Sequence, residues 1–566
     1  MSRWVWFWVC VIVALVMLLC GLQMPIHLRA VDDSVLQKAG WNSRSLVEQG
    51  VALVRADKLG AALLISQTSE RYQLPGWQKL NQDVAELARQ HPGWVVWGGP
   101  EPRFESIFES DANLRNPGFD PFTEYVVRME NRERVLSLLG ASRRPGVQEL
   151  LRLRFCTNTV LFPPSQSAAG QPLDAAISIC GLLLEGDHFA AGLSNSVVTA
   201  ASMANRGGSS QAIEDVLMSL LSLGQRFNWG QLVVFLSNIQ DPETLRLQTN
   251  LARKATRRLP ILFSAVCLSG RPSAVATYVM NFSQTGLDDL GASLRYGSDG
   301  LNELLSRNQR LDRSVYTVDR FAPMSAFLSW TAGFAWKAPW PAFITKWTLY
   351  LLAGFLFAAA LHFARPTVSS LERPLQVRGF HIAREILFAL GFLVVVLLVS
   401  EPFLTQESQK VEFPFRLRLP ITGSQVAAGT NNLIKPAFMN PLNLLTLLLF
   451  FVLQGLLYVA CLVKLAEIRR QQVAPRIKLR LLENEDHLFD AGLYLGFVGT
   501  IISLILVSIG VVKFSLMAAY SSTSFGIIFV SIFKIFHLRP TRRRLLLQSE
   551  AEAAEAVNRP AFATTS

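Results

Sequence analysis

The chain has 566 residues, of which 50% are hydrophobic and 17% charged, and its formal net charge is +12. It is too apolar for an ordinary soluble protein and too charged for a pure membrane bundle, so we expect a large soluble module joined to a membrane module. The Arg and Lys residues gather beside apolar stretches, where they act as topology determinants, and nucleic-acid binding is not expected because no basic stripe with interleaved aromatic residues lies elsewhere.

The first apolar stretch runs from Trp4 to Leu22 and follows Arg3. Its length suits a membrane span of about 20 residues, whereas a signal peptide has a shorter apolar core and a small-residue cleavage site. We interpret residues 1–22 as a retained N-terminal membrane anchor, with a cleaved signal peptide as the alternative. The preceding Arg puts the amino end inside and the following residues outside.

Residues 23–340 are expected to form a large extracytoplasmic helical domain. Apolar residues recur at i, i+3, i+4 and i+7, with Gly or Pro between segments; the clearest segments are 45–66, 77–90, 211–227, 243–259 and 299–311. Helices of this length with short breaks predict a solenoid-like stack of helical hairpins, although no exact repeat is present. The stretches 94–120 and 155–170 are richer in Pro, Gly and Asn, so they predict loops or an insertion.

Residues 341–400 are expected to hold the second and third membrane spans. The second span covers 344–363, and Trp residues stand at its entrance, where aromatic side chains prefer the membrane interface: Trp336, Trp340 and Trp347. A loop with four arginines follows, which places it inside: Arg365, Arg373, Arg378 and Arg384. The third span, 385–399, then crosses back.

Residues 401–441 are expected to form an extracytoplasmic loop. Within it, apolar and charged residues alternate from Glu412 to Leu419, a period-2 pattern that is typical of a short strand. A partly ordered loop remains the alternative.

Residues 442–538 are expected to contain the last three spans. The fourth span, 442–463, holds Gln454 as its one strongly polar residue near mid-span, for which we favour an interhelical hydrogen bond over a transport ligand. The basic run from Lys464 to Arg480 is the strongest inside signal in the chain. The fifth and sixth spans form an apolar hairpin, 489–536, with a bend near Lys513.

Residues 539–566 are expected to be a cytoplasmic tail, which begins with a basic cluster and is flexible after Glu550. The count is six spans with both ends inside. The sequence therefore predicts an all-α fold: a polytopic membrane helix bundle of about six spans with a large extracytoplasmic, solenoid-like helical domain. In a bacterium this is a multi-pass protein of the inner membrane with its large domain in the periplasm.

Enzyme chemistry has no support in the sequence. It contains no nucleophile elbow, phosphate loop or dinucleotide fingerprint, so no catalytic residue and no cofactor are predicted. The 6 Cys and 7 His residues show no paired ligand spacing, so neither a metal site nor a disulfide scaffold is predicted. The C-terminal hairpin remains as the candidate functional site.

Small and hydroxylated residues fall in register on the two legs of this hairpin. Gly496, Gly499 and Thr500 lie on the first leg, and Thr523 and Gly526 lie on the second. Over about 50 residues this order resembles the last two spans of the MotA/TolQ/ExbB proton-channel family, in which a Gly-x-x-Gly-Thr start pairs with a later Thr-x-x-Gly-like segment.

The resemblance implies a homo-oligomeric ring that couples the proton motive force to an envelope process. It implies that Thr500, Thr523 and Ser522 line the channel and that glycines permit close helix packing: Gly496, Gly499 and Gly526. It also implies a single-span ExbD/TolR/MotB-like partner with an aspartate in the membrane, because neither leg carries an acidic residue at depth. Membrane lipid is a further expected contact.

Two other interpretations stay open. The small residues of the hairpin allow two helices to pack, with the hydroxyls bonded to carbonyls one turn back. The protein would then be a membrane-anchored scaffold whose extracytoplasmic helical array binds protein or envelope ligands. A solute transporter is a weaker option, because inverted repeats and broken midplane helices are not visible.

Overall fold

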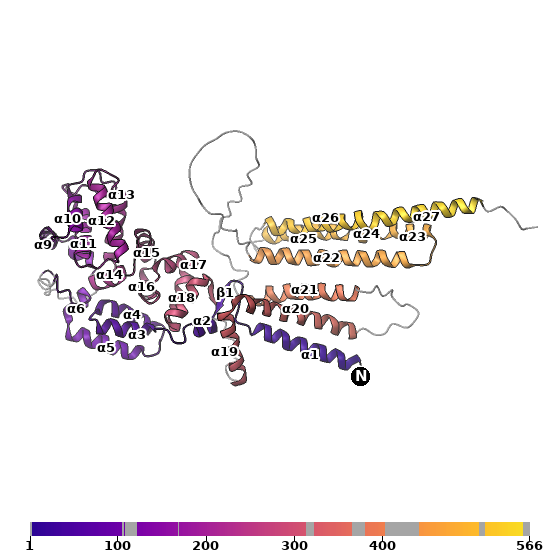
Figure 1. Ribbon diagram of the computed structural model, residues 1–566, viewed down its shortest axis with the longest axis horizontal. Coiled ribbons are helices and arrows are strands. Elements are labelled where there is room, and N and C mark those ends of the chain that lie inside the picture. Colours follow the sequence, from indigo (N-terminus) through magenta and orange to yellow (C-terminus); the bar gives the residue numbers. More distant parts are fainter. Residues whose placement is uncertain are drawn as a thin grey trace, which may run out of the picture. The chain divides into compact units, whose positions relative to one another are not determined.

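A computed structural model of the chain describes residues 3–104, 107, 121–167, 169–312, 322–364, 380–401, 441–508 and 516–558. These residues are almost all helical, with a single two-stranded sheet, which confirms the all-α prediction. The chain forms two compact units (Figure 1). The membrane unit is built from Met1–Arg29, Lys337–Glu407 and Val411–Ser566, and the large helical unit is built from Ala30–Trp336.

The membrane unit holds the most apolar helices of the protein. Its described helices are α1 (Arg3–Leu22), α20 (Pro339–Ala364), α21 (Phe380–Ser400), α22 (Pro441–Arg470), α23 (Pro475–Asn484), α24 (Asp486–Phe489), α25 (Ala491–Ser508), α26 (Leu516–Phe533) and α27 (Arg539–Asn558). Four described stretches are long and apolar enough to cross a bilayer, which indicates a membrane protein: Trp4–Leu22, Pro339–Leu361, Phe450–Arg470 and Tyr520–Glu552. Two shorter apolar stretches, Phe388–Leu397 and Ala491–Ile501, coincide with the predicted third and fifth spans. The six-span count therefore stays a prediction.

Close packing of α1 along α20 ties the N-terminal helix into the membrane unit. Gly21 makes this approach possible, because a Cβ at that position would lie 2.6 Å from Cε1 of the buried Tyr350. Tyr350 in turn packs with Leu393 and Val394 of α21. The three helices α1, α20 and α21 thus form one group, and α22, α25 and α26 form a second group that meets it through α21 and α22.

The helix of the sixth predicted span continues well past the expected end of that span. A π-helical segment, Lys534–Leu538, joins α26 to α27, and the three read as one rod in Figure 1. Pro540 explains the irregularity, because its ring carries no N–H and displaces the carbonyl four residues earlier. Helix α27 extends to Asn558, so the part of the predicted tail between Glu550 and Asn558 is helical.

The large helical unit contains short to medium helices and one small sheet. Its helices are α2 (Asp33–Ala39), α3 (Leu46–Arg55), α4 (Leu59–Arg71), α5 (Trp77–Gln90), α6 (Pro92–Trp97), α8 (Phe122–Val127), α9 (Met129–Gly140), α10 (Pro145–Arg152), α11 (Gln171–Glu185), α12 (Ala191–Asn205), α13 (Gln211–Gly224), α14 (Trp229–Leu236), α15 (Pro242–Lys254), α16 (Leu259–Ser269), α17 (Pro272–Ser293), α18 (Gly297–Arg307) and α19 (Ala322–Lys337). Strands β1 (Ala30–Asp32) and β2 (Arg310–Asp312) pair in parallel, with Ala30 opposite Arg310. Three 3₁₀ turns cover Leu153–Phe155, Thr256–Arg258 and Leu294–Tyr296.

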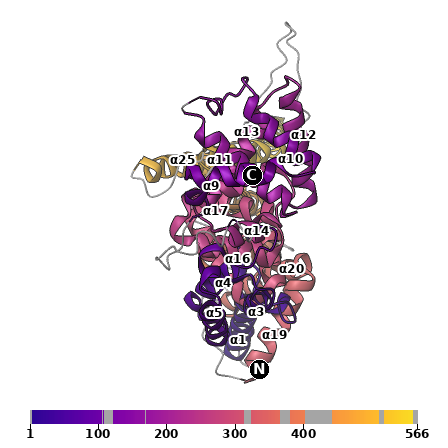
Figure 2. The ribbon, with the colours of Figure 1, turned by 90° about the vertical axis from the view of Figure 1, so that its left-hand side faces the viewer.

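The solenoid-like stack is not confirmed, because helices far apart in the sequence pack together in this unit. Helix α4 contacts α14 and α16, and α2 contacts α18. Figure 2 faces the unit and shows α10–α13 as one group and α3–α5 as another, with α14, α16 and α17 between them. A linear solenoid has contacts between neighbouring repeats alone, whereas pairing of β1 with β2 joins the beginning of this unit to a point near its end.

Local sequence signals explain many helix boundaries. Ser45 and Glu48 form a capping box at the start of α3, and Asn228 and Gln231 form another at the start of α14. The predicted helical segment 45–66 divides into α3 and α4, because Asp57 adopts a left-handed backbone with φ of 57°, which Asp tolerates better than most residues.

Several predictions fall partly or wholly outside the described residues. These are the arginine-rich loop at 365–379, the strand near 412–419, the bend near Lys513 and most of the stretch 94–120. The other predicted loop, 155–170, is confirmed as far as it is described, since neither helix nor strand lies between Phe155 and Gln171.

Candidate functional site

The hydroxyls predicted to line a channel lie between the two legs of the hairpin. Thr500 on α25 and Thr523 on α26 share a hydrogen bond between their Oγ1 atoms. The carbonyl oxygen of Gly496 lies within hydrogen-bond distance of both hydroxyls, 3.0 Å from Thr500 Oγ1 and 3.2 Å from Thr523 Oγ1. Because each hydroxyl has one proton, one threonine donates to this carbonyl while the other donates to its partner hydroxyl. Ser522 is buried at the same contact. The structure thus brings all three hydroxylated residues to one level of the α25–α26 contact.

The three predicted packing glycines lie where α25 and α26 approach most closely. A Cβ on Gly496 would lie 2.8 Å from the carbonyl oxygen of Ser522, and a Cβ on Gly526 would lie 2.6 Å from that of Gly492. A Cβ on Gly499 would lie 2.5 Å from Ser522 Oγ. No side chain fits at these distances, so the glycines set the separation of the two helices, as small residues do in membrane helix pairs.

Gln454 of α22 inserts its amide where α25 and α26 meet, at Gly492, about one helical turn before Gly496. Its Nε2 donates to the carbonyl oxygen of Gly492 at 2.9 Å, which confirms the predicted interhelical hydrogen bond. Its Oε1 is buried and has no hydrogen-bond partner among the described residues. Gln454 therefore fastens α22 to the hairpin and extends the polar seam of the threonines to a third helix.

Polar pairs that the sequence did not suggest hold the other end of these helices together. Lys534, in the π-helical segment, pairs with Asp490 at 2.7 Å, just before α25 begins. Tyr458 of α22 shares a hydrogen bond of 2.9 Å with His537. Both residues from the π-helical segment thus face a neighbouring helix, which is the usual setting for such irregular turns.

A buried charge site lies in the membrane unit, where α1, α20 and α21 converge. Lys346 of α20 and Glu401, which follows α21, are fully buried and pair at 3.0 Å. Lys346 also donates to the carbonyl oxygen of Ile26 at 2.6 Å, and Glu401 accepts the backbone N–H of Leu28 at 2.7 Å. His27 lies beside both, with its Nδ1 3.3 Å from Lys346 Nζ. We call this set of residues the buried charge site.

The electrostatics of the buried charge site keep Glu401 ionised. Burial favours the neutral carboxyl, but the hydrogen bond with His27, the charge of Lys346 and the N–H of Leu28 together outweigh it, so the pKa of Glu401 lies below its ordinary value. A carboxylate that stays charged near neutral pH is a poor proton carrier. The site is therefore suited to fixing three chain segments against one another.

One residue of the buried charge site, Lys346, could have been identified from the sequence. Lys346 interrupts an otherwise apolar helix, and charged residues inside spans usually face a partner. What the sequence does not reveal is the partner, because Glu401 lies 55 residues from Lys346 and Leu28 lies 373 residues from Glu401.

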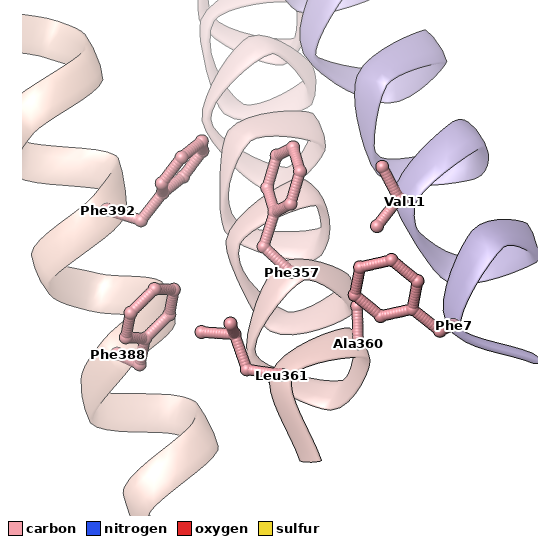
Figure 3. A pocket seen from close by; sticks show the side chains of 7 residues that line it. All are labelled: Phe7, Val11, Phe357, Ala360, Leu361, Phe388 and Phe392. Atoms are coloured by element: carbon pink, nitrogen blue, oxygen red, sulfur yellow. The ribbon is translucent and has the colours of Figure 1, made fainter. Parts of the chain in front are cut away.

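An apolar groove of about 330 Å³ lies among the same three helices (Figure 3). Figure 3 shows α1, α20 and α21 contributing side chains to its walls: Phe7, Val11, Phe357, Ala360, Leu361, Phe388 and Phe392. None of these side chains has a polar atom, so the groove offers no hydrogen bond or charge to orient a polar ligand.

The large helical unit carries a different kind of site, a loop held by a buried carboxylate. Glu214 of α13 is buried and accepts the backbone N–H groups of three consecutive residues, among them Val160 at 2.9 Å and Phe162 at 3.1 Å. Burial raises the pKa of Glu214, but the hydrogen bonds from Ser210 and from the loop backbone outweigh that effect and lower it. The carboxylate thus stays charged and holds the loop.

Further contacts fix both ends of this loop, which we call the pinned loop, residues 155–162. Arg154 forms a bidentate pair with Asp174 at 2.9 and 3.1 Å. Asn158 donates its amide to the carbonyl oxygen of Gly208 at 3.1 Å and accepts from Ser210 at 3.0 Å. The pinned loop is therefore held by side-chain contacts, since beyond the 3₁₀ turn that ends at Phe155 it has no regular secondary structure.

The pinned loop presents large apolar side chains to the solvent. Phe155 is 70% exposed, Val160 is 76% exposed and Leu161 is about half exposed. A backbone held by so many hydrogen bonds cannot turn these side chains inward, so they remain on the surface. Exposed apolar side chains held on one short loop offer a surface that a partner protein can cover.

Comparisons of the chain with protein-family models, with curated proteins and with solved structures found no match. The resemblance to MotA/TolQ/ExbB proteins therefore rests on the hairpin residues alone.

Proposed function

We propose that this protein is a membrane-anchored binding protein whose large helical unit holds a protein partner outside the cytoplasm. The observation that carries the proposal is the pinned loop, in which the exposed Val160 and Leu161 stand on backbone held by Glu214 and the exposed Phe155 directly follows Arg154, which pairs with Asp174. Apolar side chains on a rigid backbone lose little conformational entropy on binding, which favours affinity.

The geometry of the hairpin supports this function over ion conduction. Thr500 and Thr523 bond to each other and to the Gly496 carbonyl, so their polarity serves to hold α25 to α26. No Asp or Glu occurs in the chain between Asp490 and Lys534, so ion conduction by the hairpin would depend on a carboxylate supplied by a partner. The hairpin is then a packed anchor, as expected when small residues line a helix contact.

The proposed topology has six spans, with both chain ends in the cytoplasm and the large helical unit in the bacterial periplasm. Three basic segments support it, since each lies on the side that six crossings make cytoplasmic: 365–384, 464–480 and 539–544. The six-span topology requires α21 and α25 to cross the bilayer together with the four longer apolar stretches.

Affinity purification of the full chain from mild detergent, followed by mass spectrometry, tests the proposal. We compare the wild type with a variant of the pinned loop that carries F155S, V160S and L161S. The proposal predicts a partner protein with the wild type and its loss with the loop variant. The matched control is M280S, which removes an exposed apolar side chain from α17 and is expected to leave the partner bound.

Two results would overturn the proposal. Equal recovery of the partner with the loop variant and with M280S would show that the pinned loop does not bind it. Loss of the partner with T500V/T523V, at unchanged protein yield, would move the binding site to the hairpin.

A second candidate function is a proton-channel subunit of the MotA/TolQ/ExbB type. The observation that favours it is the meeting of Thr500 and Thr523 at one level of α25 and α26, because these are the two hydroxyls that the resemblance assigns to the channel. It requires a homo-oligomeric ring around a single-span partner with an aspartate in the membrane. The same purification distinguishes it, since a single-span acidic partner lost with T500V/T523V supports the channel.

A further inference from the structure

Helix α19 has two apolar faces, of which only one is covered by the protein. Thr331, Ala332 and Ala335 are buried, and Arg307 donates to the carbonyl oxygen of Ala335 at 3.3 Å. This face packs against the large helical unit. The covered face fixes the orientation of the helix and so determines which residues point away from the unit.

The uncovered face of α19 is an aromatic stripe. Phe327, Trp330 and Phe334 follow one another at i, i+3 and i+7, and their rings stack with centroid separations of 6.3 and 5.8 Å. This spacing keeps three rings on one side of a helix. Trp330, in the centre, is 65% exposed among the described residues, and Phe327 and Phe334 on either side of it are partly buried.

A second exposed tryptophan lies near α19, on the side of the helix that carries Ser329 and not on the stripe itself. Lys38 of α2 reaches Ser329 of α19, with its Nζ 3.5 Å from Ser329 Oγ, and the same Nζ lies 5.9 Å from the ring centre of Trp41. Trp41 is 71% exposed. We call Lys38, Trp41, Phe327, Trp330 and Phe334 the aromatic surface.

We propose that the aromatic surface rests in the interface of a lipid bilayer. Tryptophan together with a nearby lysine is the side-chain chemistry that membrane interfaces select, because the rings sit at the headgroup level and a lysine side chain can extend its ammonium toward phosphate. The chain itself supplies the second reason: α19 ends at Lys337 and α20 begins at Pro339, and α20 holds one of the four stretches able to cross a bilayer.

A second copy of the chain is the competing occupant of this surface. The lipid is favoured because a helix one residue away from a membrane span stays within reach of the headgroups whatever other contacts form. An amphipathic helix lying in the interface buries its apolar face to a depth of about 5–10 Å, which is enough for the rings of the stripe. This inference is independent of the partner proposed for the pinned loop.

Photocrosslinking in nanodiscs tests the inference on the full chain. The photoreactive residue p-benzoylphenylalanine replaces Trp330, Trp41 or, as the matched control, Phe155, which is similarly exposed but lies between α10 and α11. Each protein is reconstituted into nanodiscs of phosphatidylethanolamine and phosphatidylglycerol and irradiated. Adducts are identified by mass spectrometry.

We expect lipid adducts at positions 330 and 41 and none above background at position 155. Because both test positions are exposed, the substitutions leave the core intact, and the two sites check each other. Adducts between two protein chains at position 330, or equal lipid labelling at 330 and 155, would overturn the inference. Absence of any lipid adduct at both 330 and 41 would overturn it as well.

Discussion

At the scale of single residues, the charged pair of Lys346 and Glu401 has the largest energetic consequence. Removing one member of a buried ion pair leaves the other without a counter-charge, which typically costs about 3–5 kcal/mol. The pair also satisfies the carbonyl of Ile26 and the N–H of Leu28. It thereby fixes the chain that leaves α1 against α20 and α21.

A double-mutant cycle on Lys346 and Glu401 tests whether the two residues form a buried ion pair. We expect E401Q and K346M each to lower the thermal unfolding temperature strongly, and the double variant E401Q/K346M to lose less than the sum of the two, because neither charge then remains buried alone. Thermal unfolding in detergent, followed by light scattering, measures the four proteins. Additive losses would contradict an ion pair.

The glycines of the hairpin give a second prediction at this scale. In G496A the new methyl would meet the carbonyl oxygen of Ser522 at 2.8 Å, so α25 and α26 must separate and we expect a loss of about 1–3 kcal/mol. The matched control is G391A in α21, where the nearest atom, of Val452, lies 3.9 Å away. Chemical unfolding in detergent compares the two, and equal stability would refute the close approach.

At the scale of elements, the pinned loop depends on a single carboxylate. In E214Q one acceptor oxygen replaces two, and we expect hydrogen exchange of the amides of residues 160–162 to rise about tenfold or more, since hydrogen bonds to a charged group contribute about 1.5–3 kcal/mol. The control E243Q alters an exposed glutamate of α15 and should leave these amides protected. Unchanged exchange in E214Q would show that the loop is held by other contacts.

The same carboxylate predicts the pH dependence of the large helical unit. Because the pKa of Glu214 is lowered in the folded protein, its contribution to stability is complete above the ordinary carboxyl pKa of 4.5 and disappears as pH falls through the lower folded value. The difference in unfolding temperature between wild type and E214Q should thus be constant from pH 8 to about pH 5 and shrink below it. A difference that shrinks above pH 6 would contradict this assignment.

The local pattern of apolar, Gly and Pro residues predicted the positions of individual helices better than it predicted which segments pack together. Helix α5 spans the predicted segment 77–90, because its apolar spacing and the left-handed Gly76 before it are local signals. The break between α3 and α4 was missed, since a left-handed Asp57 is one of several conformations open to aspartate. The buried charge site and the pairing of β1 with β2 depend on residues hundreds of positions apart, which no local period encodes.

At the scale of the whole molecule, the proposed topology depends on how many helices cross the membrane. With six spans, the segment between α22 and α23 is cytoplasmic. If only the four longer apolar stretches crossed, the same segment would be outside. An epitope inserted after Gln472, an exposed residue of this segment, distinguishes the two topologies: we expect it to bind antibody only after the inner membrane is permeabilised, and labelling of intact spheroplasts would contradict six spans.

The most direct test of the central claim is photocrosslinking at the pinned loop in living cells. The photoreactive residue p-benzoylphenylalanine replaces Val160, the most exposed apolar side chain of that loop, and the full chain is purified after irradiation. Binding through the pinned loop predicts a covalent adduct with a partner protein at position 160. No protein adduct at position 160, together with an adduct to a single-span acidic protein when the same residue replaces Thr500, would contradict the claim and establish the hairpin as the functional site.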